Sequence, residues 1–141
     1  MASLAAVRTA LGNTVSGVSA LRVFPTFQQQ INPPTAIIMP QRGQMITFDT
    51  LEGFDSYHLQ IILMVSFAED ASSQAMMDAF LDAGPSASAS TSVLMALRAN
   101  PSLSGAVFNC VPVSVMGYGL TEWAGQQYFG CTINVQVQAG P

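Results

Sequence analysis

The sequence predicts an α+β fold in which two or three helices pack on a mostly antiparallel sheet of about four to five strands. Apolar residues recur at helical spacing near the start of the chain, and they alternate with a period of two in a long central segment and in the last segment. Helical segments and strands also fall into separate groups, an order typical of α+β domains. The length of 141 residues indicates one domain over residues 1–141.

The first half of the chain is predicted to hold one helix and several strands. The helix carries a stripe at Leu4, Val7, Leu11, Val15 and Val18. Strands are expected at 21–24 and 35–39, each followed by a proline, and a weaker strand is expected within 45–48. The segment 57–68 is the clearest strand, because its odd-numbered residues are all apolar and must face the core. Its other row begins polar and becomes apolar, which predicts that a helix or another subunit covers that end.

The second half is predicted to hold two helices and then two strands. Glu69 and Asp70 open the first helix, at the end where carboxylates are favourable. Its apolar stripe is Met76, Met77, Phe80 and Leu81. A Ser/Ala-rich link over 86–92 ends in a hydroxyl cap for a short helix that stops before Asn100. Pro112 indicates that the strand 107–116 lies at an edge or contains a bulge, and a loop is expected over 117–125. The final strand, 128–138, alternates an apolar row with a polar but uncharged row.

The composition predicts that much of the surface is buried against other subunits. Half of the residues are hydrophobic, only 9% are charged, and there is no lysine, whereas soluble domains average about 25% charged residues. The longest apolar run, 61–65, is much shorter than the roughly 18 residues of a membrane span, and residues 1–4 do not suggest a secretory leader. The net charge of −4 argues against tight binding of nucleic acid.

The residues that usually carry chemistry are scarce, so we expect no enzyme activity, cofactor or metal. His58 is the only histidine, and Asp55 is the only acid at a spacing that could reach it. A Ser-His-Asp set drawn from distant positions stays open, although no nucleophile elbow marks its serine. Cys110 and Cys131 are too far apart for a CxxC pair, and we expect buried free thiols, with a disulfide left open. The acids near residue 50 lack the spacing of a calcium loop.

Several short segments follow one another in an order that resembles the tail terminator (tail completion) proteins of long-tailed bacteriophages, especially those of phages that infect actinobacteria. They are Leu21-Arg22-Val23-Phe24, Pro34-Thr35-Ala36-Ile37-Ile38, Ala68-Glu69-Asp70, Ser92-Val93-Leu94-Met95-Ala96-Leu97, Leu103-Ser104-Gly105-Ala106-Val107 and Tyr128-Phe129-Gly130-Cys131. The resemblance spans most of the chain. Two features depart from the family pattern: Ser104-Gly105 replaces paired glycines, and the Ser/Ala run over 86–92 is long.

The resemblance implies a structural virion protein of the tail or neck, assembled in the host cytoplasm. Such proteins form a ring, typically a hexamer, that caps the tail tube and ends its polymerisation. The ring also joins a head-completion or adaptor protein, and DNA passes through it without specific binding. No catalytic residues, cofactor or membrane partner come with this family.

Two groups of residues are candidates for roles in such a ring. Acids that line the lumen would repel passing DNA, and the candidates are Asp49, Glu52, Asp55 and Glu122. Uncharged strand faces suit contacts between subunits, and the candidates are His58, Gln60, Ile62, Met64, Thr132, Asn134, Gln136 and Gln138.

Two other functions compete with this interpretation. One is another structural role in the same particle, as a head-tail adaptor or a tail-tube subunit. The other is a small α+β enzyme or ligand-binding domain, which predicts a concave pocket that holds titratable groups.

Overall fold

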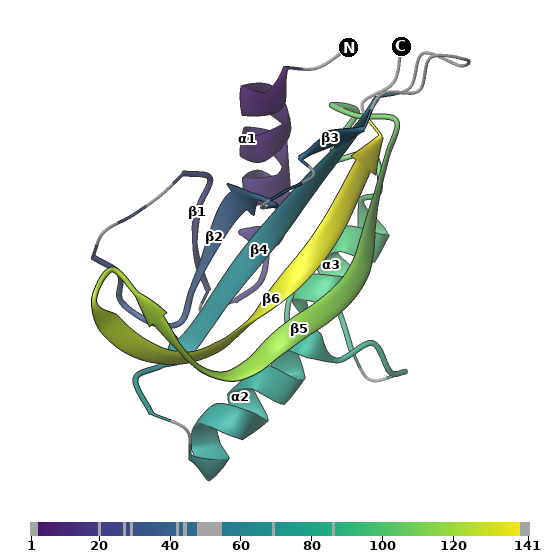
Figure 1. Ribbon diagram of the computed structural model, residues 1–141. Helices are drawn as coiled ribbons and strands as arrows, with labels where there is room; N and C mark the ends of the chain where they lie inside the picture. The colour runs from purple at the N-terminus through teal and green to yellow at the C-terminus, as the bar shows by residue number, and fades with distance from the viewer. Residues whose placement is uncertain are drawn as a thin grey trace.

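The computed structural model describes residues 3–19, 21–26, 28, 30–41, 43, 45–47, 55–68, 70–85 and 87–138. It confirms the predicted α+β fold. Helices α1 (Leu4–Val15), α2 (Ala71–Leu81) and α3 (Val93–Ala99) all lie on the same side of one sheet (Figure 1).

The sheet has the strand order β1-β2-β4-β6-β5, with β3 paired to β4. The strands are β1 (Arg22–Phe24), β2 (Thr35–Pro40), β3 (Ile46–Thr47), β4 (Ser56–Ser66), β5 (Asn109–Trp123) and β6 (Gln126–Gln138). Every pair is antiparallel except β1 with β2, which run parallel. The two long central strands, β4 and β6, pair along nearly their whole length, and β5 is the outer strand on one side.

Each helix begins at a side-chain cap. Ser3, Asp70 and Ser92 accept hydrogen bonds from backbone N–H groups three residues later, at 3.1, 2.8 and 3.4 Å, which satisfies donors that the first helical turn leaves unpaired. The hydroxyl cap expected at the end of the Ser/Ala-rich link is therefore confirmed. The predicted stripe of α2 is wrong at Met76, which is 40% exposed, whereas Met77 and Phe80 are buried.

The main core lies between the helices and one face of the sheet. The odd-numbered residues of β4 and the apolar row of β6 meet there, with Ile61 opposite Ile133 and Leu63 opposite Cys131. Burial of both rows confirms the period-two interpretation within β4 and β6, but the prediction is wrong at Phe67, which lies beyond the end of β4 and is 56% exposed. Cys110 and Cys131 are buried free thiols, and burial raises the pKa of each to about 12 because a thiolate would be poorly solvated there.

The opposite face of the sheet, which we call the open face, is covered by the chain itself at one end. Met64 is fully buried in a second apolar cluster with Ile31, Ile37 and Tyr128. The prediction that a helix or another subunit covers this end of β4 is therefore wrong. The β1–β2 connection and the curled tip of the β5–β6 hairpin supply the cover, and Trp123 Nε1 donates a hydrogen bond of 2.7 Å to the Gln28 carbonyl oxygen across them.

Candidate interaction surface

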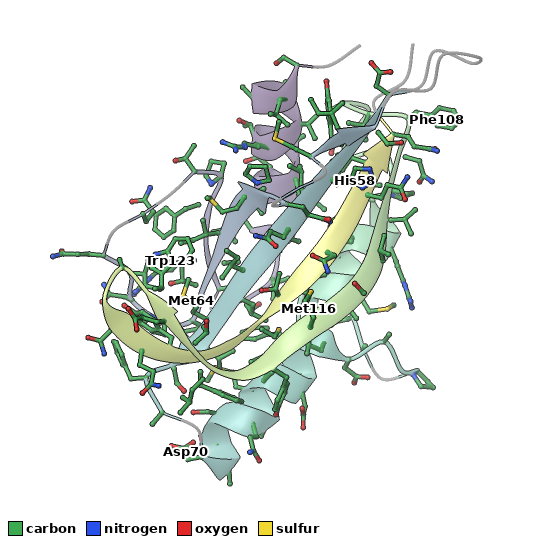
Figure 2. All side chains as sticks on the ribbon, in the orientation of Figure 1. His58, Met64, Asp70, Phe108, Met116 and Trp123 are labelled. Carbon is green, nitrogen blue, oxygen red and sulfur yellow. The ribbon has the colours of Figure 1, made fainter. Side chains whose placement is uncertain are left out.

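The exposed apolar side chains of this protein are concentrated on β5. Of the large hydrophobic residues that are at least 40% exposed, most belong to this one strand: Val111, Val113, Val115, Met116, Tyr118 and Leu120. Phe108, immediately before the strand, is 64% exposed and extends the row at one end (Figure 2). An apolar row of this length on an outer strand is typical of a surface that another protein covers.

Two register shifts explain why β5 exposes apolar side chains to both sides. The pairing with β6 shifts between Pro112 and Ser114 and again between Met116 and Gly119. The prediction that Pro112 marks an edge or a bulge is confirmed on both counts. The first shift places Val115 opposite Ile133, on the helix side, although simple alternation groups Val115 with Val111.

The loop expected over 117–125 is wrong, because β5 continues to Trp123 and the turn is confined to Ala124 and Gly125. Gly117 and Gly119 adopt φ values of +71° and +140°, which most side chains disfavour. These glycines let the strand bend and continue, so the tip of the hairpin curls across the open face (Figure 1).

The strand register brings most of the predicted interface residues together on the open face. His58, Gln60 and Ile62 of β4 lie opposite Gln136, Asn134 and Thr132 of β6, and Gln138 lies opposite Ser56. The side chains of His58, Gln60 and Ile62 are half-buried, and so are those of the three β6 partners. Met64 is the exception: its side chain is fully buried, so its assignment to a subunit interface is wrong.

The predicted lumen residues are not gathered at one place. Asp49 and Glu52 lie outside the described residues. Asp55 precedes β4 at the end of the sheet where Ser56 meets Gln138, whereas Glu122 is exposed near the hairpin tip, where it pairs with Gln127. Asp55 therefore lies at one end of the β4–β6 ladder, whereas the curled hairpin tip places Glu122 over its middle, beside Gln60 and Ile62.

A cleft of about 250 Å³ lies between the hairpin tip and the open face. Gln60, Ile62 and Thr132 form its floor, and Glu122 and Trp123 belong to its wall. These side chains offer one carboxylate and several neutral polar groups. Within the described ranges, no three histidine, cysteine or acidic residues gather in a way that could hold a metal ion.

None of the helices in the described part of the chain has the length and apolar character needed to cross a membrane. Comparison of the sequence with known protein families and with curated proteins finds no match.

Sequence reasoning missed β5 as the main exposed apolar surface. The signal was present, since valine occupies positions 111, 113 and 115 around a proline that favours an edge strand. Alternation alone did not reveal the exposure, because an identical pattern in β6 is buried beneath helices.

Proposed function

We propose that this chain is a structural subunit of a bacteriophage tail, a tail terminator that assembles into a ring of identical copies, typically six. The ring caps the tail tube, ends its polymerisation and meets the head-completion protein, while DNA passes through its centre. The observation that carries this proposal is the β5 row of exposed apolar residues in a chain with very few charges.

The exposed fractions on β5 are large for side chains of this kind. They range from 41% at Val115 to 61% at Val113. Covering these side chains would stabilise an assembly by about 25 cal/mol for each Å² of apolar surface removed from water. Interfaces between identical subunits are more apolar than other surfaces and contain few charged residues in their core, which describes this strand.

A ring requires two different contact surfaces on every subunit, because each copy meets its two neighbours in a head-to-tail manner. β5 offers an uncharged surface on each side of the sheet, because Val115 lies on the helix side and Met116 lies on the open face opposite Thr132. The half-buried polar rows continue the surface on the open face. Glu122 and Asp55 remain candidates for the lumen, where a negative charge would keep DNA from adhering.

The decisive experiment mixes the purified protein with tail-tube subunits and measures tube lengths by electron microscopy. A terminator shortens the tubes and is found at one end of each tube. A tube subunit would instead be incorporated along the whole length, and a protein that leaves both length and composition unchanged would contradict the proposal.

A substitution on β5 tests whether this strand is the assembly surface. Val113→Glu places a charge in the middle of the apolar row, and we expect it to abolish both ring formation, measured by light scattering, and the shortening of tubes. The matched control is Gln74→Glu, which adds the same charge at an exposed position of α2. If Val113→Glu behaves like the control, β5 is not the assembly surface.

A further inference from the structure

A second cleft lies far from the open face, between α1 and the segment that follows β1. The helix lies near this segment at Gly12, where an added Cβ atom would make ordinary contacts at 3.6 Å from Cβ of Pro25 and 3.8 Å from Cγ1 of Val23. One and two turns earlier, the helix carries the larger residues Arg8 and Leu4 on the same face. A wedge of space remains between the start of α1 and the segment at Pro25 and Thr26.

This wedge is a cleft of about 280 Å³ with a mixed lining. Apolar walls and two hydroxyl-bearing side chains surround one cation, and the lining residues are Leu4, Ala5, Arg8, Thr9, Pro25 and Thr26. The Nε–H group of Arg8 is buried and has no hydrogen-bond partner within the described part of the chain. A buried donor without an acceptor destabilises a fold unless something else supplies the acceptor.

We infer that this cleft binds a carboxylate group. A guanidinium presents its N–H groups in a planar fork that matches the two oxygens of a carboxylate, and the hydroxyls of Thr9 and Thr26 lie close enough to line the same space. One cation balances the single negative charge of a carboxylate.

The carboxylate belongs to an acidic side chain of a second copy of this chain. This source rests on the proposed ring, and charge balance supports it: each copy carries eight acidic residues and only four arginines. Two acids are already engaged within their own copy, because the Asp70 and Asp82 carboxylates accept hydrogen bonds from Ser73 and Gly84. Asp55, Asp78 and Glu122 are the described acids that remain as candidate partners.

The first test asks whether the cleft takes a carboxylate, and it does not require assembly. Sodium acetate is titrated into ¹⁵N-labelled protein below its assembly concentration, and the Nε–Hε resonances of Arg8 and of the exposed Arg98 are followed by NMR. We expect a saturable shift at Arg8 that sodium chloride at equal ionic strength does not reproduce, with little change at Arg98. Equal behaviour of the two arginines would overturn the inference.

The second test asks whether a neighbouring copy supplies the carboxylate. Arg8→Gln is expected to raise the protein concentration at half-assembly at least tenfold, whereas Asn13→Gln, at an exposed position of the same helix, changes it less than twofold. Circular dichroism checks that both variants fold. If the rings of Arg8→Gln are as stable as those of the parent, the second-copy source is wrong while the ring itself stands.

A charge exchange identifies the partner. Arg8→Asp is combined in turn with Asp55→Arg, Asp78→Arg and Glu122→Arg, and we expect one combination to restore assembly that Arg8→Asp alone prevents. If none of the three combinations restores assembly, Asp55, Asp78 and Glu122 do not supply the carboxylate. If the protein shows the acetate response but never assembles, the carboxylate site stands. The second-copy source and the proposed ring are then both wrong.

Discussion

β5 and β6 form one hairpin, and both alternate apolar residues, yet their apolar residues meet different environments. The apolar row of β6 packs beneath the helices, and Ile133, Val135 and Val137 are completely buried. Along β5, Val111 and Val113 remain 47% and 61% exposed, because Val111 lies opposite Gln136 on the open face and Val113 lies in a register shift. The difference shows that alternation identifies a strand, whereas the elements packed on each face of that strand decide whether its apolar residues are buried.

The largest expected effect concerns the close contact between β6 and β4. A Cβ atom at Gly130 would collide with the carbonyl oxygen of Leu63 and lie 3.1 Å from Cα of Met64. We expect Gly130→Ala to lower the free energy of unfolding by about 3 kcal/mol or more, because neither backbone can move aside without breaking the ladder. Urea unfolding measures this change, with Gly17→Ala as a control at a roomier position. Similar losses in both variants would show that β6 tolerates the added atom.

A pair of truncations compares the two strands directly. Ile133→Ala on β6 should destabilise the unassembled protein by about 2–5 kcal/mol, because it leaves a cavity in the core. Val113→Ala on β5 should change its stability by less than about 0.5 kcal/mol, since the side chain is largely in water. Urea unfolding at concentrations below assembly measures both. An equal loss in the two variants would mean that β5 contributes to the core of the subunit.

The cysteines provide a test in which the two strands should behave alike. Burial raises the pKa of Cys110 on β5 and of Cys131 on β6 from 9.0 to about 12. Above pH 9 the unfolded chain releases these protons while the folded chain keeps them, so the stability that the buried thiols contribute is present below about pH 9 and lost as the pH rises toward 12. Urea unfolding from pH 7 to 10.5 should show this decline, and a Cys110→Ala, Cys131→Ala double variant should show a flatter one. Identical pH profiles would contradict the assignment.

A local effect is expected at the hairpin tip, where β5 ends. Trp123→Phe removes the N–H group that donates to the Gln28 carbonyl oxygen, and a lost hydrogen bond of this kind costs about 0.5–1.5 kcal/mol. Hydrogen exchange of the backbone amides in residues 119–128 should become faster, while exchange in the centre of β4 stays unchanged. Thr121→Ser is the control within the same tip. Unchanged exchange would mean that apolar packing alone holds the tip in place.

Much of the fold follows from local patterns, and the main departures arise from contacts between distant segments. The helix at 4–15, the long strand β4 and the row of β6 are evident from spacing, because each carries one continuous apolar face. The extension of β5 past Gly117 is not evident, since glycine usually interrupts a strand and here permits a bend. The burial of Met64 depends on Ile31 and Tyr128, which are remote from it in sequence.

The candidate site could be predicted only in part, because it also depends on contacts between distant segments. The polar row of each strand could be predicted, because alternation fixes which side chains of a strand point together. That the rows of β4 and β6 share one face follows from the pairing of these strands, which the sequence did not reveal. The exposure of β5 depends on its outer place in the strand order, and the cleft at Arg8 depends on how closely α1 approaches Pro25 at Gly12. Strand order and the approach of a helix to a sheet are not encoded in any short segment.

The interruptions in β5 have a consequence for solubility. Pairing runs without a shift only over 109–112, 114–116 and 119–123, each shorter than the six or seven residues without proline that favour amyloid zippers. Pro112 also withholds one of the backbone donors that an incoming strand would need. The strand can therefore expose apolar side chains to water, while its interrupted pairing makes it a poor template for fibril growth.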